Sequence, residues 1–418
     1  MASTHGTGTA AASLSSLLLD VGVPFRMRSG ELLLEAQAHH GVQRWLDHFD
    51  RVTLCAPIVP EALVDPSMQW IAATPLVQGG RLAVVALPWG YDVRGHMTHV
   101  AAVRRTFRVL IPRHDRLCFA NFGWLGAWGR IGAEEAFAQD RRFAVWFDWV
   151  LQDMPLRPER NAAKRVWRKA ERSVLRRLVL RDIRRASLGL FNGRTVFDAY
   201  ASWSTNPRVV HDVHLTEADL ITEAQLEARL ARKEGPLRIV CVGRVHEMKG
   251  PRQWLDAVAT AIAERRGPRG ITATWFGDGP LLAEMRALVA ARNLSAEVSF
   301  RGLEADRGRV AAALRDADLF LSCHLTPESP RTLIEALMSG LPIAAFSSAY
   351  ALDLLAGNVE GGVFAAMGDS VALGRELARC LADPARLQRI SRAAYSAGRE
   401  YSDARVFKHR SDLIKEYV

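Results

Sequence analysis

Short apolar runs alternate with helical patterns through the second half of the chain. The apolar runs predict strands at 237–242, 272–276, 298–300, 319–323 and 343–346. Residues with helical periodicity lie between them, at 249–266, 279–292 and 307–315. Apolar strands that alternate with helices are typical of a parallel, doubly wound sheet. Such a sheet binds its ligands at the carboxyl ends of its strands.

The first half follows the same alternation less regularly. Its strand candidates are 17–23, 51–59, 69–75, 81–87, 116–122, 142–149 and 187–191. Helices are expected at 29–49, 96–109 and 132–139, and a further helix at 216–230. Because some strand candidates lie close together, a meander at one edge of this sheet stays open. The pattern predicts an α/β protein with two Rossmann-like halves.

The length of 418 residues suits two domains of ordinary size. We expect a flexible leader at 1–16, a first domain at 17–213, a linker at 214–236, a second domain at 237–400 and a last helix at 401–418. The five cysteines have neither CxxC nor Cys/His spacing. They are therefore expected to be reduced core residues rather than disulfides or zinc ligands.

Segment 326–342 carries the strongest signal for a ligand site. Pro330 suits the first position of a helix, and Gly340 with Pro342 ends that helix. Three amides of the first helical turn would then form an anion site at the helix N-terminus: those of Arg331, Thr332 and Leu333.

Two carboxylates flank this predicted anion site. Glu328 lies in the turn before the helix, and Glu335 lies about one turn inside it. Phosphate-binding amides between two carboxylates that can bind hydroxyl groups suit a nucleotide-sugar.

The loop 242–250 adds two cations at the end of another predicted strand. Gly243 allows a tight turn after the strand, and Arg244 and Lys249 precede the helix that begins after Gly250. Together the two cations can hold a diphosphate and neutralise it as it leaves. Taken alone, the loop could equally be a solvated surface turn.

Four segments, at 242–250, 276–280, 299–302 and 326–342, resemble in order and spacing the motifs of the retaining GT-B glycosyltransferases of family 4, also described as glycosyl transferases group 1. The resemblance covers the chain from about residue 237 to the C-terminus. It implies a GT-B fold, in which two Rossmann-like doubly wound domains face an interdomain cleft and the last helix returns to the first domain. The family has seven residues between its two glutamates, whereas this chain has six, and strict spacing would place Pro327 at the first position.

The resemblance also implies roles for individual residues. Arg244 and Lys249 would stabilise the departing diphosphate, Glu328 would hold hydroxyls of the donor sugar, and Glu335 would hold the ribose. The remaining implied donor contacts are Gly243, the backbone of Arg301, and the amides of Arg331, Thr332 and Leu333.

The first domain resembles the family poorly. It lacks a Gly-Gly loop after the first strand, and the nearest substitute is 24–30, which makes Gly30 a candidate contact. Asp148 falls in the region where the family often places a His that faces the donor sugar. A helix cap or a buried, hydrogen-bonded carboxyl is the alternative. His211 and His214 have no third ligand nearby, so a structural role is favoured over a metal site. No metal or other cofactor is expected.

The net charge of +10 is concentrated in one segment, 157–185, with twelve Lys or Arg residues and three acidic ones. Within it, 164–185 places apolar residues at helical spacing among cations and predicts a basic amphipathic helix. Such a helix at 160–185 suits an anionic membrane surface, where each cation contributes on the order of 1 kcal/mol. The alternative is a surface helix whose apolar stripe packs on its own domain. Nucleic acid is not expected, since the segment has one Trp for base stacking.

The resemblance implies a retaining glycosyltransferase. It would move a hexose-type sugar from a nucleotide-sugar to a glycan or lipid-linked acceptor in cell-surface polysaccharide assembly. We expect it in the cytoplasm, peripheral on the inner face of the membrane. Two alternatives remain open: a GT-B hydrolase or epimerase of the nucleotide-sugar, and a non-catalytic membrane or nucleic-acid binding protein on a decayed GT-B scaffold.

Overall fold

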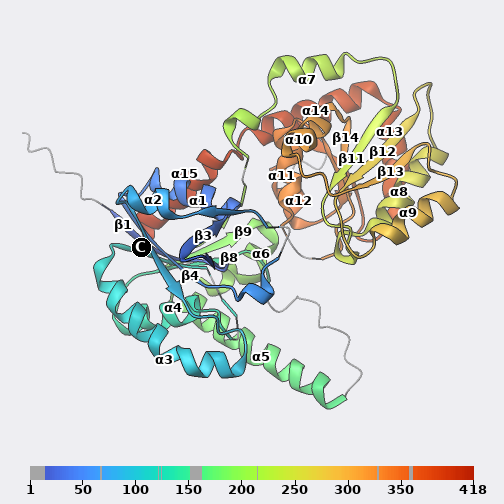
Figure 1. Ribbon diagram of the computed structural model, residues 1–418. Coiled ribbons are helices and arrows are strands. Elements are labelled where there is room, and N and C mark those ends of the chain that lie inside the picture. The colour runs from blue at the N-terminus through green and yellow to red at the C-terminus, as the bar shows by residue number, and fades with distance from the viewer. Residues whose placement is uncertain are drawn as a thin grey trace, which may run out of the picture.

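The computed structural model contains two α/β halves, each built around a parallel sheet (Figure 1). The structure describes residues 15–65, 68–120, 122–123, 125–150, 162–213, 215–326, 329–356 and 361–418. The two halves confirm the predicted fold class.

The first sheet has seven strands in the order β10-β9-β8-β7-β1-β4-β6. Their bounds are β1 Ser16–Asp20, β4 Arg51–Pro57, β6 Leu82–Leu87, β7 Arg116–Phe119, β8 Ala144–Phe147, β9 Leu188–Asn192 and β10 Pro207–Val210. Each neighbouring pair is parallel, so no meander forms at its edge. Every residue of β1 is buried, as expected for a central strand that is covered on both faces.

The second sheet has six parallel strands in the order β13-β12-β11-β14-β15-β16. Their bounds are β11 Leu237–Val242, β12 Ile271–Phe276, β13 Val298–Gly302, β14 Leu319–Ser322, β15 Ile343–Phe346 and β16 Val363–Ala365. The strand order reverses between β11 and β14. The crevice at such a reversal is where open α/β sheets bind ligands.

A third, antiparallel sheet follows β1 and corrects the sequence analysis. It consists of β2 Arg26–Arg28, β3 Glu31–Glu35 and β5 Trp70–Ala72. Ser29 and Gly30 close the β2–β3 hairpin with φ of 51° and 81°, the left-handed geometry that two-residue hairpin turns require. The helix expected from residue 29 therefore begins only at α1 Ala36–Leu46, where the Glu35 carboxylate caps the amides of Gln37 and Ala38.

The helices of the first half are α2 Thr74–Gln78, α3 Val93–Leu110, α4 Gly129–Ala138, α5 Ala162–Arg185 and α6 Gly193–Tyr200. The later helices are α7 Glu223–Leu230, α8 Pro251–Ala263, α9 Leu282–Ala291, α10 Arg307–Asp316, α11 Arg331–Met338, α12 Ala349–Asp353, α13 Ser370–Leu381, α14 Pro384–Gly398 and α15 Asp403–Tyr417. The single helix expected at 216–230 is split, because a 3-10 turn at Glu217–Asp219 precedes α7 and each has its own threonine capping box.

The basic helix α5 does not carry one continuous apolar stripe. Val179 and Ile183 are buried against the first half, whereas Val166 and Val174 are 67% and 40% exposed. The apolar residues of this helix therefore divide into a buried group and an exposed group. The C-terminal half of α5 packs on its domain, and the N-terminal half projects away from it (Figure 1).

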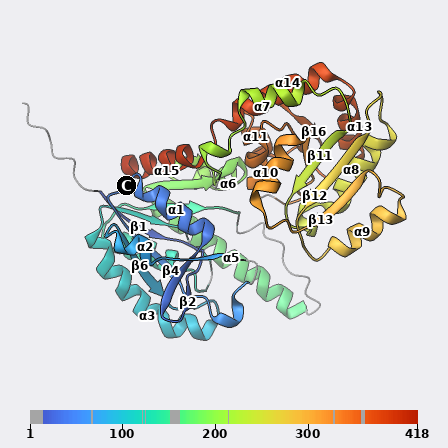
Figure 2. The same cartoon turned by 45° about the horizontal axis from the view of Figure 1, so that its top comes forward.

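The last helix, α15, lies against the first half, although the preceding helix α14 belongs to the second (Figure 2). Phe407 packs edge-on against Trp45 of α1, with ring centroids 5.2 Å apart. Arg410 is fully buried, with its guanidinium 4.4 Å from the Trp146 ring centroid. It donates to the His211 carbonyl and to Asp212 Oδ1 at 3.3 Å. The chain therefore crosses between the two halves twice.

We predict that Arg410→Met lowers the free energy of unfolding by about 2 kcal/mol, since it leaves the partly buried Asp212 without one of its cations. Urea denaturation followed by tryptophan fluorescence measures the loss. Lys408→Ala, on the exposed side of the same helix, is the control and should change stability by less than about 0.5 kcal/mol. An equal effect of both changes would contradict the structural role of Arg410.

Candidate functional site

The candidate site lies at the carboxyl ends of β11 and β14, where the order of the second sheet reverses. β11 and β14 are hydrogen-bonded neighbours, so the loops that follow them leave the same edge of the sheet. The loop after β11 carries Arg244 and Lys249, and the loop after β14 leads into α11. The fold therefore brings together two motifs that are about 80 residues apart in the sequence.

Glycines allow the loop after β11 to pack tightly against the loop after β12. A Cβ on Gly277 would clash with the Gly243 carbonyl oxygen, and one on Gly279 would clash with that of Val245. At Gly243 itself a Cβ would point into open space, but its φ of 151° is one that other residues rarely adopt. The Gly-Asp-Gly turn thus serves backbone packing, and Gly243 leaves room above the end of β11.

Lys249 is brought to the loop that precedes α11 by another close backbone approach. Gly250 has φ of 61°, and a Cβ there would clash with the Cys323 carbonyl oxygen. Next to it, the Met248 carbonyl accepts a hydrogen bond from the Leu325 amide at 2.8 Å. Lys249 is half-buried, and its positive charge opposes the rise that burial causes in the pKa of the Cys241 thiol. Arg244, by contrast, is exposed at the start of the same loop.

The helix after β14 begins one residue later than predicted. Pro330 is the N-cap and Arg331 the first helical residue. The Leu333 amide donates to the Pro330 carbonyl at 3.1 Å within the first turn of the helix. An anion site formed by the amides of Arg331, Thr332 and Leu333 stays a prediction.

Of the two predicted carboxylates, the structure describes one, Glu335. Glu335 is half-buried on α11, and burial raises the pKa of its carboxyl, while the charges of Arg331 and Arg307 oppose that rise. Glu328 and Pro327 lie outside the described residues. The assignment of the first glutamate role to Glu328 stays a prediction.

The first half faces this site through residues at the end of β8 and β9. Asn192 donates from Nδ2 to Asp148 Oδ1 at 3.2 Å, and its carbonyl accepts from Ser329 Oγ at 2.6 Å. A Cβ on Gly193 would clash with the ring of Tyr350. The two halves are therefore in direct contact beside the turn that leads into α11.

Asp148 is exposed at this junction. The surrounding protein nevertheless desolvates its carboxyl in part, and this desolvation raises its pKa to about 6. The negative charge of Asp212 raises the pKa further, whereas Arg410 and the hydrogen bond from Asn192 lower it. The structure thus places Asp148 at the interface between the halves, and its predicted contact with the donor stays a prediction.

Arg331 makes a second link between the halves that the sequence analysis missed. Its guanidinium lies 3.1 Å from Gln37 Oε1 in α1 and 3.3 Å from Asp212 Oδ2 after β10. In the sequence, the only signal for this link is that Arg331 is a cation within segment 326–342. Its partners come from segments about 290 and 120 residues earlier, and no local pattern marks them.

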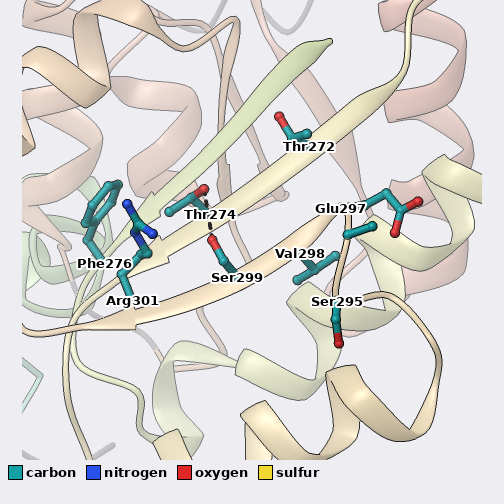
Figure 3. A pocket seen from close by; sticks show the side chains of 9 residues that line it. Thr272, Thr274, Phe276, Ser295, Glu297, Val298, Ser299 and Arg301 are labelled. Carbon is teal, nitrogen blue, oxygen red and sulfur yellow. Dashed lines mark hydrogen bonds between the residues drawn. The ribbon is translucent and has the colours of Figure 1, made fainter.

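Gly30 and Arg301 lie farther out. Gly30 is at the hairpin tip, separated from Glu35 and α1 by the five-residue strand β3, about 17 Å of extended chain. Arg301 lies near the end of β13 (Figure 3). A shallow pocket of about 300 Å³ runs from Arg301 and Phe276 along β12 and β13. Gly30 therefore does not lie beside α1, whose Gln37 contacts Arg331. The predicted donor contacts of Gly30 and of the Arg301 backbone stay predictions.

His211 has a structural environment. Its ring packs edge-on against Tyr401, with centroids 5.0 Å apart, and lies 3.9 Å from Asp353. Burial, together with the charges of Arg410 and His409, lowers the pKa of His211 to about 4. His214 lies outside the described residues. In the part of the chain that the structure describes, no group of three or more His, Cys, Asp or Glu is placed to hold a metal ion.

The second half matches a known family. Residues 236–383 match the sequence profile described as Glycosyl transferases group 1. The chain is 33% identical over 172 residues to a 2-deoxystreptamine glucosyltransferase from Streptomyces kanamyceticus, which covers 41% of this chain and 42% of the relative. It is 24% identical over 191 residues to an alpha-monoglucosyldiacylglycerol synthase from Streptococcus pneumoniae, covering 46% of this chain and 42% of the relative. The chain thus spans less than half the length of each of these curated relatives.

Solved structures match over nearly the whole chain and show the GT-B fold. Anabaena HepE, solved in complex with UDP, superposes with a TM-score of 0.65 at 18% identity, covering 96% of this chain and all of HepE. Sucrose-phosphate synthase from Thermosynechococcus elongatus superposes with a TM-score of 0.64 at 15% identity, covering 96% and 98% of the two chains.

We predict that Asp148→Asn raises the melting temperature on the order of 2 °C at pH 8 and has no effect at pH 4. Because the folded-state pKa of Asp148 lies above its ordinary value, ionisation disfavours folding as the pH rises, and this cost is fully present above about pH 6. Scanning calorimetry at the two pH values measures the difference. Asp198→Asn, which removes a half-exposed partner of Arg194, is the control and should bring no stabilisation at pH 8. A pH-independent effect of Asp148→Asn would contradict the raised pKa.

Proposed function

We propose that this protein is a retaining GT-B glycosyltransferase of family 4, which transfers a hexose-type sugar from a nucleotide-sugar to a glycan or lipid-linked acceptor. One arrangement carries the proposal. Two loops leave the carboxyl edge of the second sheet where its strand order reverses between β11 and β14. One loop carries the cations Arg244 and Lys249, and the other leads into the N-terminus of α11. That edge faces the first half, and it falls within the segment that matches the glycosyl transferase profile.

UDP-glucose is the donor that we propose first. HepE was solved with UDP and with UDP-glucose, and both curated relatives are named for glucose transfer or glucosylated products. On this proposal the diphosphate lies at the reversal of strand order, and the ribose lies near Glu335. The uracil lies toward the end of β13, where the backbone of Arg301 would contact it.

The proposed reaction breaks the bond between the anomeric carbon and the diphosphate oxygen. The acceptor hydroxyl oxygen forms a bond to the same carbon from the face that the diphosphate leaves, so the anomeric configuration is retained. The acceptor proton passes to an oxygen of the leaving diphosphate. Arg244, Lys249 and the amides of Arg331 and Thr332 stabilise the charge that develops there, which is commonly the largest contribution to catalysis. This scheme requires neither a metal nor a protein nucleophile.

We further propose that the acceptor belongs to a cell-surface polysaccharide or lipid-linked glycan, and that the enzyme works on the cytoplasmic face of the membrane. The basic residues that the projecting half of α5 presents support an anionic surface as its partner. The relative from Streptococcus pneumoniae is named for a glucosylated diacylglycerol. In the described part of the chain, no helix is long and apolar enough to span a membrane.

Binding of the donor should stabilise the protein by mass action, with about 2.7 kcal/mol at a concentration one hundred times the dissociation constant. We predict a rise in melting temperature with UDP-glucose that Lys249→Ala largely removes, because Lys249 holds the diphosphate. A thermal-shift titration with UDP-glucose and other nucleotide-sugars measures the effect. Lys408→Ala, a surface lysine on α15, is the matched control and should keep the shift. If no nucleotide-sugar stabilises the wild-type protein, the proposed function is wrong.

Transfer from an α-linked donor should produce an α-linked product, because departure and attack occur on one face of the sugar. We predict this outcome for proton NMR of the product anomer when UDP-glucose is incubated with diacylglycerol or amino-cyclitol acceptors. A β-linked product would contradict retention. Release of free glucose at the same rate with and without every acceptor would instead support a nucleotide-sugar hydrolase.

A further inference from the structure

The first half exposes a cluster of apolar side chains at the start of α3. Tyr91, Val93 and Met97 are 40%, 67% and 69% exposed within seven residues of sequence. The Trp89 ring, half-buried, lies 4.5 Å from the Tyr91 ring. We call these four residues the apolar lip. Single exposed apolar residues are ordinary on protein surfaces, whereas a contiguous group marks a surface for interaction.

The loop that carries the apolar lip is tightly packed against neighbouring residues. A Cβ on Gly90 would clash with the Trp128 ring, and one on Gly126 would clash with the backbone at Gly90 and Tyr91. The buried ring of His96 stacks on Trp128 with centroids 5.0 Å apart and accepts a hydrogen bond from the Gly126 amide at 3.2 Å. The lip therefore remains exposed although the loop that carries it is packed against its neighbour.

The lip and the projecting half of α5 lie on the same side of the first half. α3 follows β6, so its N-terminus is at the carboxyl edge of the first sheet, which faces the candidate site. α5 precedes β9 and reaches that edge with its own N-terminal half, since its 24 residues extend about 36 Å, farther than any strand beneath it (Figure 1).

α4 connects the two helices. Glu134 of α4 pairs with Arg104 of α3 at 2.8 Å and with Arg181 of α5 at 2.7 Å. α3 and α5 are therefore fixed relative to each other, and the lip and the projecting half of α5 form parts of one surface.

Cations accompany the apolar groups on this surface. Arg94 is exposed beside Val93 on α3. Among the exposed cations of α5, Lys169, Arg176 and Arg177 lie nearest in sequence to the exposed Val174. Apolar and aromatic side chains flanked by cations match the boundary of an anionic bilayer, where aromatic rings lie at headgroup level and cations attract the lipid phosphates. A soluble protein partner would not require the excess of cations that both helices share.

We propose that the apolar lip inserts into the boundary of an anionic lipid bilayer, while the cations of α5 lie on the headgroups, so that the carboxyl edge of the first sheet is held near the membrane surface. This inference rests on the proposed transferase in one respect: it makes the acceptor a glycan or alcohol carried on a lipid. Membrane binding itself does not depend on transfer.

The test is co-sedimentation of the full-length protein with vesicles of neutral phosphatidylcholine, with and without 30% phosphatidylglycerol, at about 0.15 M salt. Wild-type protein is expected to bind the anionic vesicles. Val93→Ser/Met97→Ser is expected to weaken that binding tenfold or more. Val371→Ser/Met367→Ser, which removes the same two residue types from exposed positions 44% and 51% accessible in the second half, is the matched control and should bind like wild type.

Circular dichroism and the UDP-glucose thermal shift are measured on every variant, because they separate a folding defect or a failed donor site from a lost membrane contact. Equal binding of the lip variant and wild type would overturn the role of the lip. Absence of wild-type binding to anionic vesicles would overturn the membrane proposal, even if UDP-glucose still stabilises the protein. Loss of binding on changing Arg176 and Arg177 to Glu, with the lip intact, would support the combined surface.

Discussion

The architecture depends on a close backbone approach at one point of the second sheet. Gly250 has no Cβ, so the loop after β11 lies directly against the Cys323 carbonyl at the end of β14. Any larger residue there would push the loop, and Lys249 with it, away from the N-terminus of α11. The positive end of a helix and two cations can share one anion only if this distance stays short. The glycines at 277 and 279 extend the same packing to β12.

Charged and polar groups link the two halves at their junction. The Asp212 carboxylate lies between Arg331 of the second half and Arg410 of the returning helix, both at 3.3 Å. Ser329, one residue before the N-cap of α11, donates a hydrogen bond to the Asn192 carbonyl. The side-chain amide of Asn192 in turn donates to Asp148. The segment predicted to bind the diphosphate is thus connected by hydrogen bonds to Asn192 and Asp148 of the first half. A ligand in the cleft would meet side chains whose positions are already coupled.

The first half differs from the second in what surrounds its sheet. Its first loop is a three-stranded antiparallel unit instead of a glycine turn, and α5 projects well past the strands. Both features lie outside the segment that matches the family profile. The departures from the family motifs therefore lie in the first half, and the segment that matches the profile lies in the second.

The sequence by itself determined the fold class, the order of elements in the second half and the motifs at 242–250 and 326–342. These are local properties: apolar runs, glycines at turns, a proline before a helix and a glycine after it. The sequence analysis was wrong at 29–35. This apolar stretch was expected to be helical, but residues 31–35 form a strand, because pairing with β2 and β5 decides the conformation and a local pattern does not contain that information. Only the tertiary structure decided the roles of Asp212, Gln37 and Asn192, since their partners in the second half and in α15 lie more than a hundred residues away and contact depends on how the two halves pack.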